Sequence, residues 1–120
     1  MLGAMARSYA CPVELSLGVL GGKWRVVILA HLKQQPLRYS DLRRLIPRVS
    51  EKMLTQRLHE LCEAGLVTKR GERYALSSRG RSAAPVLQAL YDWGQRVAPE
   101  LGLLIDPPRA ASATSRTKRS

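Results

Sequence analysis

Four polar side chains near the middle of the chain recur at steps of three and four residues: Lys52, Thr55, Gln56 and His59. This spacing places all four on one face of a helix. A Gln amide can pair with adenine through two hydrogen bonds, a Lys ammonium can donate to guanine, and a Thr methyl can contact a thymine methyl. The pattern therefore predicts a helix that lies in the DNA major groove, with Lys52 and Gln56 as the residues that contact bases.

Ser50 stands just before this helical segment. A serine there is expected to cap the helix, and the free N–H groups of the helix start can hold a phosphate. We expect Ser50, Thr55 and Arg57 to contact either bases or the DNA backbone. The alternative is an ordinary solvated face, which any surface helix has. That alternative is favoured when the helix is considered alone.

Two groups of residues on either side of the helix change this balance. The preceding segment contributes Ser40, Arg43 and Arg44, and the following one contributes Lys69, Arg70 and Arg73 near a hairpin tip. Such hairpins lie along phosphates or insert an Arg into the minor groove. Charges on an edge strand can equally serve to prevent strand-to-strand aggregation, and the two interpretations of the hairpin have equal weight. With the flanking cations included, DNA binding is favoured.

The overall charge indicates the same partner. The 120 residues include 20 Lys and Arg against 9 Asp and Glu, which gives a formal net charge of +11. Residues 37 to 82 hold eleven of these cations and only five acids. An excess of this kind favours association with a polyanion such as double-stranded DNA.

The two cysteines, Cys11 and Cys62, are too few for a disulfide framework and fit a reducing cytoplasm. Cys11 precedes Pro12 at a predicted helix start, where the helix dipole would favour its thiolate, so it is a candidate redox sensor. The alternative is an unreactive thiol that caps the helix, and it is slightly favoured. Cys62 falls on the apolar side of its helix and is expected to be an inert core residue.

The sequence offers little for catalysis. His31 and His59 have no companions at metal-ligand spacing, so no metal site and no cofactor are predicted. No glycine-rich phosphate loop, paired-carboxylate cluster or Ser-His-Asp arrangement is evident. We do not expect an enzyme.

The helices and strands that position these residues can be predicted from apolar periodicity, from capping residues and from the Gly and Pro residues that end helices. We expect helices at residues 12–20, 23–33, 40–46, 51–64 and 78–97, a short edge strand at 37–39, and a hairpin pairing 66–69 with 73–76. Ser40 and Ser50 are predicted caps, and Gly65 a helix stop. Pro85 predicts a kink or a late start of the last helix. This is a mainly α fold with a small β-hairpin, a winged helix-turn-helix.

One domain, residues 9–106, is expected between a flexible N-terminus at 1–8 and a disordered basic tail at 107–120. Met5 is an alternative start to Met1. No apolar run is long enough for a membrane helix, and no secretory signal is visible, so we predict a cytoplasmic protein without a membrane partner.

The last helix has an apolar stripe that exceeds what a small core needs. It consists of Val86, Leu87, Leu90, Tyr91, Trp93 and Val97. We expect this stripe to form a homodimer interface; the alternative is simple core packing within one chain. Two protomers related by a two-fold axis would present their DNA-contacting helices about 34 Å apart, one turn of DNA.

Three stretches resemble a known family: CPVELSLGVLGGKWRVVILAHL, RYSDLRRLIPRVSEKMLTQRLHELCEAGLV and LSSRGRSAAPVLQALYDWG. Together they are similar to the HxlR-type transcriptional regulators, a MarR-like winged-helix family, over roughly residues 9 to 97. The resemblance implies a homodimer formed through the N- and C-terminal helices that binds an inverted-repeat operator near a promoter. It also implies an oxidant or electrophile effector sensed by a cysteine at the position of Cys11. One departure is the wing, which is shorter here than the family pattern.

We therefore expect a sequence-specific regulator, with repression favoured over activation and a small-molecule or oxidant effector. The competing hypotheses are a winged helix used for protein–protein contact and a nonspecific DNA-coating protein. A specific regulator should prefer its operator over random DNA by a factor on the order of 10³ or more. A coating protein would show steep salt dependence without that preference.

Overall fold

The computed structural model describes residues 8–105 of the chain. The predicted tail at 107–120 and nearly all of the predicted flexible N-terminus lie outside these residues. The helices are α1 (Pro12–Leu20), α2 (Lys23–Gln34), α3 (Tyr39–Leu45), α4 (Glu51–Glu63), α5 (Ser78–Ser82) and α6 (Ala84–Val97). The strands are β1 (Leu37–Arg38), β2 (Val67–Arg70) and β3 (Arg73–Leu76), and a 3-10 turn spans Pro99–Leu101.

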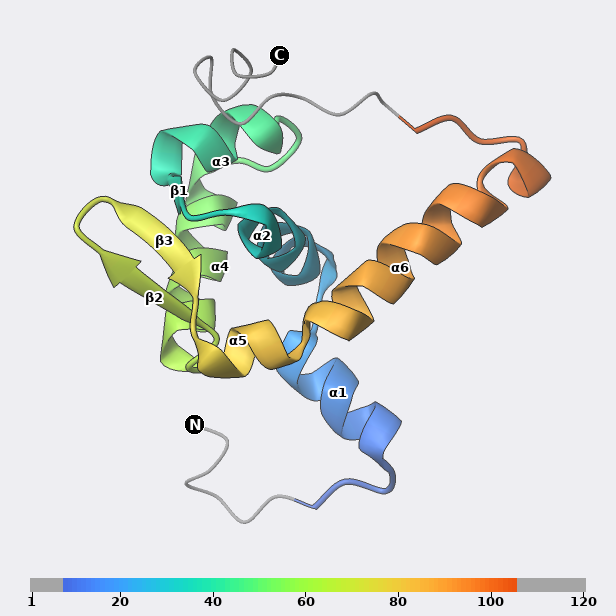
Figure 1. The fold of residues 1–120 in the computed structure, drawn as a ribbon, viewed down its shortest axis with the longest axis horizontal. Helices are drawn as coiled ribbons and strands as arrows, with labels where there is room; N and C mark the ends of the chain where they lie inside the picture. Colours follow the sequence, from blue (N-terminus) through green and yellow to red (C-terminus); the bar gives the residue numbers. More distant parts are fainter. Residues whose placement is uncertain (1–7, 106–120) are drawn as a thin grey trace.

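Helix α2 lies at the centre of the domain, in contact with α3, α4, α6 and β3 (Figure 1). Its apolar positions Ile28, Leu29 and Leu32 are buried. The core continues through Leu42 of α3, Leu54 and Leu61 of α4, and Leu66 and Leu76 around the hairpin. The predicted mainly α fold with a small wing is confirmed.

The sheet has three antiparallel strands in the order β1-β3-β2. The β2–β3 hairpin pairs Val67 with Leu76 and Arg70 with Arg73 across a two-residue turn of Gly71 and Glu72. Gly71 has φ +60°, which a glycine adopts without steric cost and which fits a tight hairpin turn. The wing is therefore as short as the sequence predicted.

The first hairpin strand begins one residue later than predicted because the Leu66 N–H takes part in the capping motif that follows α4. Gly65 has φ +76°, the N–H of Gly65 donates to the Cys62 carbonyl, and the N–H of Leu66 donates to the Leu61 carbonyl. These two bonds form a Schellman motif, which satisfies carbonyls that a helix end leaves free. Gly65 was correctly predicted as the helix stop.

The predicted cap of α3 was wrong. The helix begins at Tyr39, so Ser40 lies inside its first turn and Arg38 occupies the cap position. The buried carboxylate of Asp41, at the third position of the helix, accepts the backbone N–H of the cap residue Arg38 at 3.0 Å, which is the reciprocal bond of a capping box.

The last helical segment divides where Pro85 predicted a late start. Helix α5 ends at Ser82, and α6 begins at Ala84 with the proline in its first turn, where its missing N–H costs nothing. Ser77 rather than Ser78 caps α5, since its Oγ accepts the Gly80 N–H at 3.0 Å.

Helices α1 and α6 project from this central body (Figure 1). No residue of α1 is buried, and Leu87 is the only buried residue of α6. Leu87 is 1% exposed within its own protomer, so the prediction that it forms a dimer interface was wrong and the core alternative holds for it. Within residues 8–105, no helix is both long and apolar enough to cross a membrane.

Candidate nucleic-acid interface

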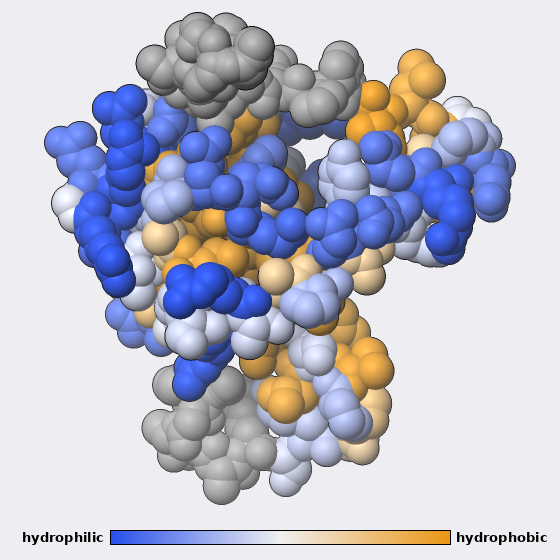
Figure 2. Space-filling model, in the orientation of Figure 1, coloured by the Kyte–Doolittle hydropathy of each residue, from blue (hydrophilic) through white to orange (hydrophobic). Residues whose placement is uncertain are grey.

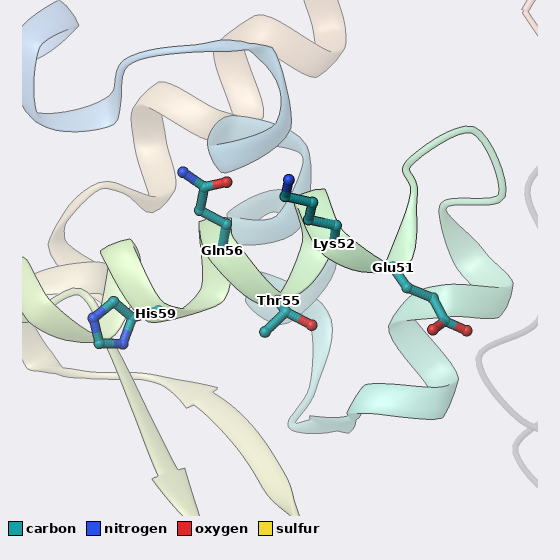
Figure 3. Close-up of a pocket in the computed structure, with 5 residues that line it drawn as sticks. All are labelled: Glu51, Lys52, Thr55, Gln56 and His59. Atoms are coloured by element: carbon teal, nitrogen blue, oxygen red, sulfur yellow. The ribbon is translucent and has the colours of Figure 1, made fainter.

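Helix α4 separates an apolar side from a polar side. Leu54, Leu58 and Leu61 face the core and are at most 2% exposed. Lys52, Thr55, Gln56 and His59 lie on the solvent side, where with Glu51 they line an open hollow (Figure 3). We call the first four residues the polar face. The structure thus brings together the side chains whose spacing predicted a common helix face.

The start of α4 is fixed as expected. Ser50 is its N-cap, and the Ser50 Oγ accepts the Met53 N–H at 3.1 Å. This bond satisfies one of the free donors at the helix start and defines the direction in which the helix leaves the turn.

Two members of the polar face have no bond within residues 8–105. Neither the Lys52 ammonium nor the Gln56 amide makes a hydrogen bond or ion pair there, and both side chains are exposed. His59 has only a long, exposed contact with Glu63, 3.9 Å from Nε2 to Oε2. Polar groups that are held on a rigid helix and left unpaired are available to an external partner.

The arginines of α3 are engaged within the protein. Arg43 donates to the Val49 carbonyl at 2.9 Å and lies 3.8 Å from the Glu51 carboxylate. Arg44 donates to Asp41 at 3.1 Å. The Arg43 bonds hold the turn between α3 and α4, so Arg43 positions the helix pair, whereas the Arg44 bond lies within α3 and stabilises that helix. Ser40 is exposed in the first turn of α3.

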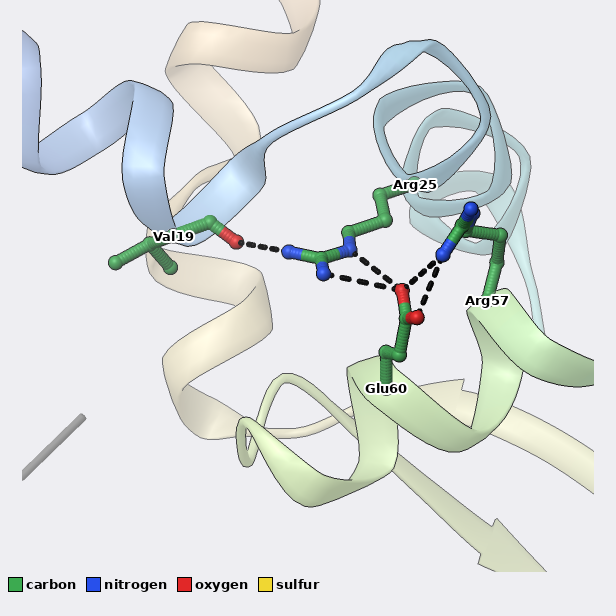
Figure 4. A network of polar contacts seen from close by, with 4 residues as sticks. All are labelled: Val19, Arg25, Arg57 and Glu60. Atoms are coloured by element: carbon green, nitrogen blue, oxygen red, sulfur yellow. Dashed lines mark hydrogen bonds and ion pairs between the residues drawn. The ribbon is translucent and has the colours of Figure 1, made fainter. Parts of the chain in front are cut away.

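Arg57 lies away from the polar face and forms part of a charged cluster (Figure 4). Its Nη1 donates to both Glu60 oxygens at 2.6 Å. Arg25 of α2 donates to Glu60 through Nε at 3.0 Å and reaches the Val19 carbonyl at 3.5 Å. The hydrogen bond from Arg57, assisted by Arg25, lowers the pKa of the Glu60 carboxyl. The cluster ties α4 to α2, which leaves Arg57 as a residue that positions the helix.

Sequence reasoning missed Arg25 and Glu60 as parts of the site. The three-residue step from Arg57 to Glu60 indicates an intrahelical ion pair. No local pattern links Arg25 to a residue 35 positions away.

The wing gathers its three cations at the hairpin. Lys69, Arg70 and Arg73 are all exposed, and Arg70 is paired with Arg73 next to the turn. The Lys69 ammonium lies 5.4 Å from the centre of the Tyr74 ring, its cross-strand neighbour. The cations therefore lie at one end of the sheet, as predicted, though their contacts with DNA stay a prediction.

Tyr39 is another residue that the sequence did not single out. Its hydroxyl lies 3.2 Å from the Glu51 carbonyl and 3.2 Å from the Thr55 Oγ1. The first residue of α3 thereby touches the first turn and the polar face of α4. The only indication in the sequence is an aromatic residue with a polar tip, which usually finds a partner.

Comparison with known proteins agrees with this architecture. Residues 19–101 match the HxlR-like helix-turn-helix family. The chain belongs to that family. It is thus a DNA-binding transcriptional regulator rather than an enzyme, as the sequence predicted.

Three relatives illustrate the similarity of this HxlR-like protein. The uncharacterised HTH-type transcriptional regulator YtcD of Bacillus subtilis (strain 168) is 41% identical over 95 residues, which cover 73% of this chain and 75% of YtcD. The redox regulator HypR in its oxidised form is 32% identical with a TM-score of 0.68, over 72% of this chain and 96% of HypR. Quinone-bound YodB from B. subtilis is 31% identical with a TM-score of 0.64, over 72% of this chain and 99% of YodB.

The cysteines of the HxlR-like chain differ in environment. Cys11 is exposed at the N-cap position of α1, but its thiol makes no capping hydrogen bond, so the capping role in the alternative was wrong. Cys62 is half-buried, and desolvation, together with the nearby Glu63 carboxylate, raises the pKa of its thiol. In the part of the chain that the structure describes, no group of three or more His, Cys, Asp or Glu could hold a metal ion.

Proposed function

We propose that this HxlR-like regulator binds an inverted-repeat operator as a homodimer, with one α4 in the major groove of each half-site. The observation that carries the proposal is the polar face, with Lys52 and Gln56 exposed and unpaired on a helix fixed by its core and its cap. The N-terminal residues of a recognition helix are those that contact base edges. Lys52 and Gln56 lie in the first two turns of α4.

The flanking elements supply the contacts that are independent of sequence. The exposed wing cations can lie along phosphates, and Ser40 and Ser50 stand at the starts of α3 and α4, where N–H groups favour an anion. In this assignment Arg43, Arg44 and Arg57 keep the helices in place, and any phosphate contact by them is secondary.

Exposed apolar residues on the projecting helices support a homodimer. On α6, Val86, Leu90, Tyr91 and Trp93 are 45% to 58% exposed. On α1, Val13 and Leu17 are 65% and 68% exposed, and Figure 2 shows apolar residues gathered along this helix. A helix of nine residues with nothing buried is marginal in water unless it packs against something. A second copy would cover these faces, with half-buried Val97 near the edge and Leu87 left in the core.

The same dimer accounts for repression. A protein seated across an inverted repeat within a promoter excludes polymerase from that DNA, so we assign repression as the sign of regulation. Expression of a reporter placed behind the operator should rise when the regulator is removed.

Cys11 is proposed as the site at which an oxidant or electrophile acts. Its thiol is exposed and unpaired among residues 8–105, at the start of a helix proposed to lie in the dimer interface. Two similar proteins are described as a redox regulator and as quinone-bound. Conjugate addition of the Cys11 thiolate to a quinone would form a C–S bond at the expense of a ring C=C bond. The electron pair would move to a quinone oxygen, which takes up a proton from water, and the resulting hydroquinone thioether would place a bulky group at that interface. Quinone should change operator affinity in the wild type and in Cys62→Ser, but not in Cys11→Ser.

Selection of bound fragments from random DNA by the full-length protein tests the operator assignment. We expect a motif with two-fold symmetry, half-sites about one helical turn apart, and a preference on the order of 10³ over random DNA. Steep salt dependence without preference would indicate a coating protein, and no DNA binding would indicate a protein-interaction module.

Two variants then separate base contacts from backbone contacts. Gln56→Ala should cost about 1–3 kcal/mol on the operator and relax the preference at one position in each half-site. Arg70→Ala, at the wing tip, should weaken operator and random DNA alike and reduce the salt slope by about 1. An equal loss of specificity in both variants would contradict the assignment.

A further inference from the structure

The hydroxyl group of Tyr39 lies between two groups of α4. It is 3.2 Å from the Glu51 carbonyl oxygen and 3.2 Å from the Thr55 Oγ1. Tyr39 is the first residue of α3, and its ring packs against the core. The position of its hydroxyl is therefore fixed by α3 and the core.

The hydrogen atoms of this arrangement can be assigned. A tyrosine hydroxyl has one hydrogen to donate, and a carbonyl oxygen can only accept. The Tyr39 hydroxyl therefore donates to Glu51, and the contact with Thr55 requires the Thr55 hydroxyl to donate to Tyr39. The one hydrogen that Thr55 could have offered to DNA is used within the protein.

The same bond sets the direction of the Thr55 methyl group. Oxygen and methyl share the β-carbon of threonine, so a fixed oxygen fixes the rotamer and hence the methyl. Figure 3 shows the Thr55 oxygen turned toward the Glu51 side and the methyl carbon turned the opposite way. Thr55 is exposed and lines the hollow beside Lys52 and Gln56, so its methyl group is presented on the polar face.

We propose that Tyr39 orients Thr55 to recognise the C5 methyl group of one thymine in each half-site. In the major groove that methyl is the apolar mark of a thymine, and an apolar side-chain group is its natural contact. Tyr39 is then a positioning residue for specificity, and Thr55 is the residue that touches the base. This assignment rests on the proposed binding of an operator by α4.

A different use of Thr55 is conceivable on the same face. Its oxygen keeps lone pairs that could accept a hydrogen bond from an adenine or cytosine amino group. The two uses respond differently to loss of the thymine methyl and to loss of the threonine oxygen, so one set of duplexes distinguishes them.

The test uses the full-length protein and the duplex enriched from random DNA, with each thymine replaced in turn by deoxyuridine. This change deletes only the methyl group. For the wild type we expect one position in each half-site where affinity falls about four-fold, the effect of burying one methyl group, and about sixteen-fold when both half-sites are changed. Elsewhere the replacement should have little effect.

Three variants assign that effect to the proposed residues. Thr55→Ser, which keeps the hydroxyl but lacks the methyl, should remove the difference between thymine and uracil, whereas Thr55→Val should keep it. Tyr39→Phe retains the ring but frees the Thr55 hydroxyl, and should reduce the difference. Lys52→Ala is the matched control: it should weaken binding and leave the thymine-to-uracil ratio unchanged.

Three outcomes would overturn the proposal. They are no uracil-sensitive position in the wild type, an unchanged ratio in Thr55→Ser, and an unchanged ratio in Tyr39→Phe. A loss of affinity in Thr55→Val without uracil sensitivity would assign the oxygen instead. If no sequence is enriched at all, the operator proposal fails first and this one fails with it.

Discussion

Helices α4 and α1 both contain several leucine, valine or methionine residues, but only α4 is built into the protomer. Leu54 and Leu61 of α4 are fully buried, while Val13 and Leu17 of α1 are about two-thirds exposed. Helix α4 is also tied to α2 through Glu60 and to α3 through the Tyr39 hydroxyl. In the part of the chain that the structure describes, α1 is bonded to α2 through the 3.5 Å contact from Arg25 to the Val19 carbonyl.

This contrast separates two kinds of surface. The polar face of α4 is unpaired but rigidly supported. A surface that recognises a partner without rearranging needs this kind of support. On α1, Val19 and Leu20 pack against the core at the end of the helix, whereas Val13 and Leu17 are exposed within the protomer. The position of the first part of α1 therefore depends on what packs against those exposed residues. Variants that act on one helix should therefore leave the other largely unaffected.

The largest expected effect comes from the core beneath α4. Leu54→Ala removes a fully buried side chain and should lower the free energy of unfolding by about 2–5 kcal/mol. Chemical denaturation followed by circular dichroism measures this. The matched change on α1, Leu17→Ala, should cost less than about 0.5 kcal/mol at protein concentrations where the chain is monomeric. Equal losses from both variants would contradict the difference between the helices.

The sequence predicted the bounds of α1 and α4 closely and predicted α6 less well, for a physical reason. The cap at Ser50, the stop at Gly65 and the alternation of apolar and polar faces are local, and local patterns are visible in a sequence. The placement of Leu87 in the core depends on how α6, which begins at Ala84, packs against α2, and this tertiary contact is not visible in a local pattern.

The contacts that position the candidate site were harder to predict. Arg57 looked like a DNA contact because its charge and helix were right, but it donates to Glu60, which Arg25 also binds. Ser40 looked like a cap because of its type, but Arg38 is the cap residue and its backbone N–H donates to the Asp41 carboxylate. These outcomes depend on tertiary neighbours, which residue spacing alone does not give.

The next largest effect is expected from a variant in the exposed apolar face of α6, which tests whether a second copy of the chain covers that face. Trp93 of α6 is 57% exposed, and large aromatic residues at the centre of an interface often cost 2 kcal/mol or more when truncated. Trp93→Ala should therefore weaken dimerisation by about thirty-fold or more, as measured by sedimentation. Its stability as a monomer should change little, because the ring is not in the core.

The control for Trp93 lies on the same helix. Arg96 is exposed in the last turn of α6 and has no bond within residues 8–105. Arg96→Ala should leave the oligomeric state unchanged. If Trp93→Ala sediments as the wild type does, the apolar face of α6 is not the dimer interface.

The smallest effect concerns the charged cluster that fixes α4. Arg57 and Arg25 lower the pKa of the Glu60 carboxyl. The ionised carboxylate therefore contributes to the free energy of unfolding above pH 4.5, which is the usual pKa of a glutamate. This contribution is lost as the pH falls through the lower value that the folded state gives the carboxyl. The partners are about one-quarter exposed, so the contribution is limited to about 1 kcal/mol. Glu60→Gln should be less stable than the wild type at pH 7, and the two should converge once the pH falls below the lowered pKa of Glu60.

The matched control is Glu63→Gln on the same helix, where the carboxylate is exposed and meets only His59 at 3.9 Å. Removing this charge should leave the stability at pH 7 within about 0.5 kcal/mol of the wild type. If Glu60→Gln loses no more stability than Glu63→Gln, the cluster does not hold α4 in place. The support of α4 would then come from its buried leucines alone, and the contrast with α1 would reduce to apolar burial.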